Sequence, residues 1–159
     1  VGFFSDYGIL GLGARYFFIP MADVHITMGA DPTGALVGVG SRAYFTPLAT
    51  KCFFVFDCLP RFFAGGTFLR SSGGDVSATD SGLEGRYNRS TGSALSFSIG
   101  SYDVFRSGLT MGFELGYRFW LDRPEGSFQS GTFFPSHLSE LDEWAKDSFS
   151  FAFTLGWSI

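Results

Sequence analysis

The last twelve residues of the chain, 148–159, alternate without a break between large apolar and small side chains, and none of them is charged. The large residues of this stretch are Phe149, Phe151, Phe153, Leu155, Trp157 and Ile159. Because successive side chains of a β-strand point to opposite faces, this period of two predicts a strand with one strongly apolar face. A transmembrane barrel strand needs such a face against lipid and a small or polar face inside. At a tilt of about 40°, the stretch spans on the order of 30 Å, close to the hydrocarbon thickness of a bilayer.

The composition agrees with a barrel in lipid. Aromatic residues make up 19% of the chain, with 21 Phe, whereas charged residues make up only 16%. A soluble domain of 159 residues would expose many of these rings in patches larger than a few hundred Å². No apolar run approaches the roughly 20 residues of a membrane-spanning helix. We therefore predict a single domain, 1–159, with an all-β, eight-stranded antiparallel up-and-down transmembrane β-barrel whose first strand is incomplete.

The same alternation places the other strands and their connections. Strands are expected at residues 1–4 (a stub), 9–19, 23–30, 35–45, 62–70, 94–105, 109–121 and 148–159. Two stretches rich in polar residues, 71–92 and 122–147, are expected to be long loops outside the cell, and the acidic part at 139–146 to form one or two helical turns. The segment 46–60 is interpreted as a packed turn. The alternation slips near Tyr102 and Asp103, which predicts a bulge there.

Six ionisable residues fall on the expected inner faces: Arg15, Asp23, His25, Arg42, Glu114 and Arg118. Eight strands enclose an interior just wide enough for side chains to fill, so these residues must lie within reach of one another. An unpaired charge in that interior would cost several kcal/mol. We expect a paired network that plugs the lumen; the alternative is a narrow gated ion path.

These motifs resemble the small outer-membrane β-barrel family typified by the OmpA membrane domain and OmpX. The pattern Gly-x-Gly-x-Arg occurs at 11–15 and 38–42, the sequence Gly-Tyr-Arg-Phe occurs at 116–119, and the alternating strand follows at 148–159. The resemblance implies a place in the bacterial outer membrane and contact with its lipid and lipopolysaccharide. Members usually end on an aromatic residue, whereas this sequence ends on Ile159. We expect any export signal to lie outside the sequence, which starts at Val1.

For function we expect a structural surface or adhesion-type protein, or the membrane anchor of an assembly with other envelope proteins. We expect no catalytic residue, cofactor or metal site, and the net charge of −4 offers no basic surface for nucleic acid. One alternative is a lipid A-modifying enzyme that uses Ser136 and His137, with Glu140 nearby; the plainer interpretation of Ser136 and Glu140 is a helix N-terminus. The other alternative is a small ion channel.

Further candidate sites lie in the connections and at the expected membrane boundary. Cys52 and Cys58 form a disulfide or remain two free thiols, and the sequence leaves both open. The acidic loop residues bind divalent cations between lipopolysaccharides, bind a protein partner or form a solvated face: Glu125, Glu140, Asp142, Glu143 and Asp147. The candidates for an aromatic girdle are Tyr7, Tyr16, Tyr117, Trp120 and Trp157.

Overall fold

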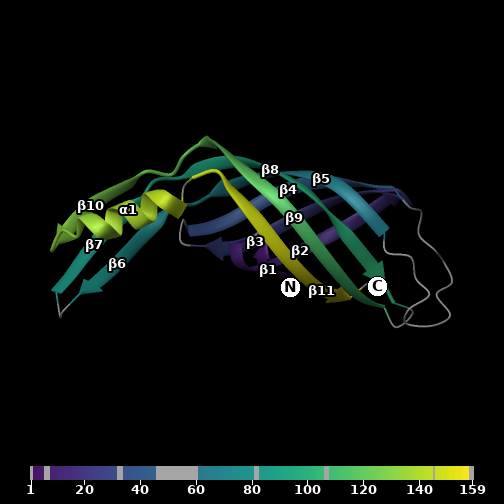
Figure 1. Ribbon diagram of the computed structural model, residues 1–159, viewed down its shortest axis with the longest axis horizontal. Helices are drawn as coiled ribbons and strands as arrows, with labels where there is room; N and C mark the ends of the chain where they lie inside the picture. The colour runs from purple at the N-terminus through teal and green to yellow at the C-terminus, as the bar shows by residue number, and fades with distance from the viewer. Residues whose placement is uncertain are drawn as a thin grey trace.

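The structure is a computed structural model that describes residues 2–5, 8–31, 34–45, 61–80, 83–105, 108–144 and 146–157. In this part of the chain the fold is all-β, with a single α-helix. The strands form a large, strongly curled antiparallel sheet and a smaller three-stranded sheet that extends from one end of it (Figure 1). This helix is too short to cross a membrane.

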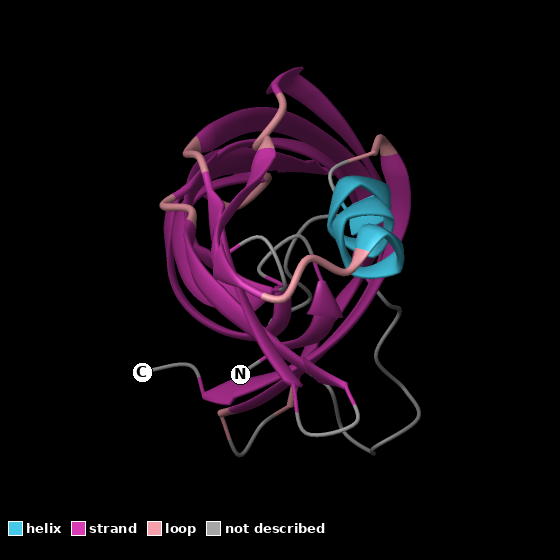
Figure 2. Ribbon diagram, turned by 90° about the vertical axis from the view of Figure 1, so that its left-hand side faces the viewer, coloured by secondary structure: helices cyan, strands magenta, loops and turns pink. Residues whose placement is uncertain are grey.

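The large sheet contains eight of the described strands. They are β1 (Gly2–Ser5), β2 (Gly8–Ile19), β3 (Ala22–Asp31), β4 (Gly34–Tyr44), β5 (Arg61–Ser71), β8 (Gly92–Val104), β9 (Leu109–Asp122) and β11 (Ser148–Trp157). Their order is β1-β11-β9-β8-β5-β4-β3-β2, and every pairing is antiparallel. The sheet curls round on itself, as Figure 2 shows from one end. The short strand β1 pairs with β2 on one side and with β11 on the other.

The two faces of this sheet differ as the alternation predicts. Large apolar side chains stand exposed on the convex face of every long strand, for example Leu12, Ile26, Val39, Phe68, Ile99, Leu115 and Phe151. The cross-strand register aligns them in rows, such as Ile26 with Val39 and Val39 with Phe68. Polar and aromatic side chains are buried on the concave face. The strands therefore have an apolar exterior and a polar interior, the reverse of a soluble protein.

The small sheet corrects the prediction that 71–92 and 122–147 are loops. It consists of β6 (Gly74–Asp80), β7 (Leu83–Arg89) and β10 (Gly126–Gly131), in the order β10-β7-β6, and α1 (Pro135–Trp144) contacts β10. Tyr87 is fully buried at its centre against Val76 and Phe134. The described strands therefore exceed the eight expected. The predicted helix is present but begins earlier, at Pro135.

Three smaller predictions also change. The pairing of β8 with β9 is regular through Tyr102 and Asp103, and its irregularity lies instead between Ser93 and Ala94. Trp120 is buried on the concave face and is therefore not a girdle residue, whereas Tyr16, Tyr117 and Trp157 are exposed. Tyr7 and the segment 46–60 lie outside the described residues.

Candidate functional site: a polar network on the concave face

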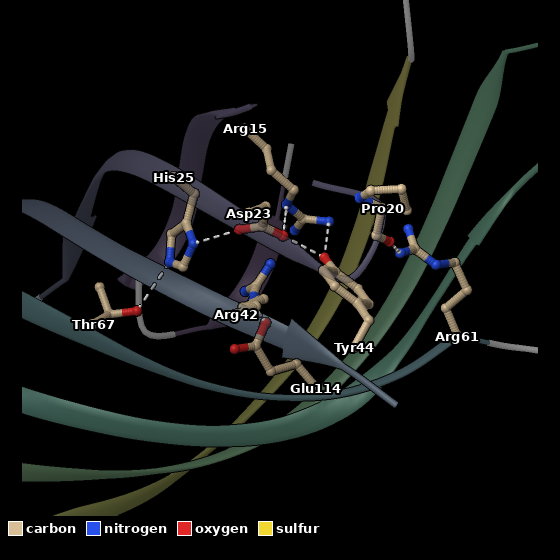
Figure 3. A network of polar contacts seen from close by, with 9 residues as sticks. All are labelled: Arg15, Pro20, Asp23, His25, Arg42, Tyr44, Arg61, Thr67 and Glu114. Atoms are coloured by element: carbon tan, nitrogen blue, oxygen red, sulfur yellow. Dashed lines mark hydrogen bonds and ion pairs between the residues drawn. The ribbon is translucent and has the colours of Figure 1, made fainter. Parts of the chain in front are cut away.

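The carboxylate of Asp23 is the centre of the network in Figure 3. Asp23 lies near the start of β3 and is completely buried. Its Oδ2 atom accepts a hydrogen bond from the Tyr44 hydroxyl and lies 3.4 Å from Nε of Arg15, and its Oδ1 atom lies 3.2 Å from Nδ1 of His25. Side chains from three strands therefore contact one carboxylate. These contacts offset part of the free-energy cost of burying its charge.

His25 extends this contact across a neighbouring strand. Its Nε2 atom lies 3.0 Å from Oγ1 of Thr67 on β5, although β4 runs between β3 and β5. The residue of β4 in register with both is Gly40. A Cβ atom at Gly40 would lie 2.6 Å from each of these two polar atoms, so only glycine leaves room for the hydrogen bond.

Arg42 and Glu114 form a second buried contact. Arg42 Nη2 donates to Glu114 Oε2 at 2.5 Å, and both side chains are almost fully buried. Arg42 is also the cross-strand neighbour of Asp23, so the two groups of charges adjoin. This ion pair joins β4 to β9, which are separated in the sheet by β5 and β8, and it therefore crosses the concave side.

At this end of the concave face, two arginine guanidinium groups lie against aromatic rings. The Arg61 guanidinium lies 4.1 Å from the centre of the Tyr44 ring and 5.1 Å from that of Phe17, and its Nη2 atom donates to the carbonyl of Pro20. Arg15 lies 4.2 Å from the ring centre of Tyr102. Such contacts stabilise a cation most where water is excluded. Arginine and aromatic side chains therefore fill the concave side near the turn between β2 and β3.

The structure thus brings five of the six predicted lumen residues together. Arg15, Asp23 and His25 form one group, and Arg42 with Glu114 forms the other. The sixth, Arg118, is also buried but lies further along β9, with its guanidinium 5.7 Å from the Trp120 ring centre.

Sequence reasoning missed three participants, Tyr44, Arg61 and Thr67. Tyr44 shares the inner face of its strand with Arg42, which was a usable signal. The contact of Thr67 with His25 depends on the neighbour order of three strands, which periodicity does not provide. Arg61 follows directly on the segment 46–60, whose structure the sequence did not settle.

The other predicted sites lie elsewhere. Cys52 and Cys58 are outside the described residues, so their disulfide stays a prediction. Ser136 is exposed on α1, and nothing is described of the side chains of His137 and Glu140. Asp147 accepts a hydrogen bond from the Trp120 backbone at 3.0 Å and lies 3.5 Å from Arg123, which ties the segment before β11 to the end of β9. In the described ranges, no three His, Cys, Asp or Glu side chains cluster as a metal site would require.

In this site, buried carboxylates and arginines neutralise one another. Asp23 and Glu114 are each held by an arginine, and guanidinium faces rest on aromatic rings. Comparisons with family models, with curated proteins and with solved structures found no match.

Proposed function

We propose that this chain is an outer-membrane protein whose large sheet closes into an eight-stranded transmembrane β-barrel. The observation that carries the proposal is the combination of an exposed apolar convex face with charges buried on the concave face. In water, such a convex face would far exceed the few hundred Å² that monomers expose. In a bilayer, a transmembrane barrel needs an apolar convex face of this kind against the lipid.

Closure at β1 follows from the same environment. Hydrocarbon offers no hydrogen bonds, so an open sheet edge within it costs several kcal/mol for each unpaired group. The pairing of β1 with both β2 and β11 supports closure at this strand. In the described residues β1 has four residues and β2 has twelve, so β1 pairs with only part of its neighbour.

Within this barrel the network acts as a plug, and the protein serves a structural or adhesion-type role. The buried pair Arg42–Glu114 crosses the lumen, and the Arg61 stack fills one mouth. The small sheet and α1 extend beyond the opposite end, where they would face the outside of a bacterial cell among the lipopolysaccharides (Figure 1). A small hydrogen-bonded sheet that projects from a plugged anchor supports contact with other envelope or surface components more directly than transport.

Flotation with liposomes tests the proposal. The protein is refolded from denaturant by dilution into liposomes or into buffer without lipid or detergent, and each sample is centrifuged in a density gradient. The proposal predicts that the protein floats with the liposomes, resists alkaline extraction and precipitates without lipid. A folded, monodisperse protein in buffer alone would overturn it.

A further inference from the structure

The two edges of the small sheet differ in how they are covered. On one edge, β10 contacts α1, and its register with β7 shifts between Phe128 and Ser130. On the other edge, β6 pairs with β7 over seven consecutive residues without a shift. In the part of the chain that the structure describes, β6 has no second strand partner.

Strand β6 carries two acidic residues, Asp75 and Asp80, but few of the other features that usually protect an edge. Its sequence, Gly-Asp-Val-Ser-Ala-Thr-Asp, contains no Lys and no Pro, and its pairing has no bulge. The carboxylate of Asp75 accepts hydrogen bonds from Asn88 at 2.8 Å and from Gln129 at 3.3 Å. This charge is therefore held over the sheet, toward β7 and β10, and not at the open edge.

The sequence of β6 is compatible with pairing to a second copy of itself. In an antiparallel pair centred on Ser77, Asp75 lies opposite Thr79, and Asp80 lies opposite Gly74. All seven residues are then paired, and no acidic residue faces another. A shift of one position toward the C-terminus would place Asp75 opposite Asp80, and like charges directly opposite destabilise a strand pair.

We propose that β6 pairs antiparallel with β6 of a second copy that lies in an apposed membrane. The proposal rests on the proposed function, because it requires the barrel to be an anchor. β6 leads away from the large sheet, at a slant to the long axis of the molecule (Figure 1). Two copies side by side in one membrane would therefore both have β6 pointing away from that membrane. Antiparallel pairing needs copies that face each other, so the contact is a homotypic adhesion that forms one continuous sheet of six strands.

Liposomes that contain the full chain test this pairing, with turbidity as the readout. Flotation first establishes that the protein is in the membrane. Wild-type proteoliposomes are expected to aggregate, and empty liposomes to remain dispersed. In Ser77→Lys the two lysines lie opposite each other at the twofold axis, so aggregation is expected to be lost. Ser77→Asp should lose it for the same reason.

The decisive sample is a mixture of Ser77→Lys and Ser77→Asp proteoliposomes, in which opposite charges meet and aggregation should return. Ser130→Lys is the matched control. Ser130 lies in the same cross-strand row as Ser77, through Arg86, but on the covered edge, so this variant should aggregate like wild type.

Three results would overturn the inference and leave the membrane anchor intact: inserted wild-type protein that fails to aggregate liposomes, aggregation that persists in Ser77→Lys, or a mixture that stays dispersed. Loss of aggregation in Ser130→Lys would also overturn it, because a general charge effect would then explain the result. Failure of the wild-type protein to float with the liposomes would instead contradict the proposed function.

Discussion

Arg42 and Glu114 are 72 positions apart in the sequence, yet their side chains form a 2.5 Å ion pair on the concave side of the large sheet. The pair joins β4 to β9, and the next inward position toward the N-terminal side of Arg42 is Gly40, which makes room for the His25–Thr67 contact. Side-chain contacts between strands that are not neighbours in the sheet therefore stabilise the interior, in addition to the backbone hydrogen bonds between neighbouring strands.

Removing the charge of Glu114 should strongly destabilise the fold. Glu114→Gln removes the carboxylate that pairs with the buried Arg42, and breaking a buried ion pair typically costs about 3–5 kcal/mol. Urea unfolding of the protein in detergent micelles measures the change in unfolding free energy. The control is Glu84→Gln, because Glu84 pairs with Arg86 at 3.5 Å on the exposed small sheet. That change should cost about 0–1 kcal/mol. Equal effects of the two variants would contradict the assigned role of the buried pair.

A methyl group at Gly40 should disrupt the network without changing any charge. In Gly40→Ala the new Cβ atom would lie 2.5 Å from the Gly66 carbonyl oxygen, as well as against His25 and Thr67. We expect a loss of about 1–3 kcal/mol in the same unfolding assay, as for overpacked interiors. Gly66→Ala is the control, because its nearest heavy atom would be 3.8 Å away. A Gly40→Ala protein as stable as Gly66→Ala would show that the contact around His25 is looser than described.

The hydroxyl of Tyr44 should matter more than that of an exposed tyrosine. Tyr44→Phe removes a hydrogen bond to the buried Asp23 carboxylate, and loss of one partner of a buried polar group costs about 1–3 kcal/mol. Tyr16→Phe, on the exposed convex face, should leave the unfolding free energy nearly unchanged. The reverse order of the two effects would contradict the position of Asp23 at the network centre.

The proposed plug predicts that the protein does not conduct ions. Planar bilayers that contain the wild-type protein should show no steady conductance if, as proposed, the Arg42–Glu114 pair and the Arg61 stack block the barrel interior. Channel recordings at fixed voltage provide the measurement, with protein-free bilayers as the baseline. A reproducible unitary conductance would favour the alternative of a small ion channel.

The strands of the large sheet could be predicted from the sequence because each has one apolar face. In β3, for example, Val24, Ile26 and Met28 alternate with Asp23, His25 and Thr27, and the structure exposes the first set and buries the second. The inward positions of the charged residues follow from the same period of two. Which charges meet depends on strand order and on the curl of the sheet, so the partners of Asp23 and Arg42 could only be named as a group.

The small sheet could not be predicted because its strands carry very little apolar signal. Tyr87 is the only large apolar side chain of β7 that is buried, and one of its partners, Phe134, lies 47 positions away. Tyr87 accepts a hydrogen bond from the backbone of Phe134 at 2.7 Å, a tertiary contact with no local sequence pattern. Ser, Gly, Asp and Thr around these residues are typical of loops, which explains the wrong prediction for 71–92.

Quenching of tryptophan fluorescence by brominated lipids tests the central claim most directly. Trp157 is 66% exposed on the convex face, whereas Trp120 is 4% exposed on the concave face. Two variants in liposomes each retain one of them: Trp120→Phe with Trp144→Phe keeps Trp157, and Trp144→Phe with Trp157→Phe keeps Trp120. The account predicts strong quenching of Trp157 and little quenching of Trp120. Equal quenching of both, or quenching of Trp120 alone, would contradict a sheet whose convex face meets lipid.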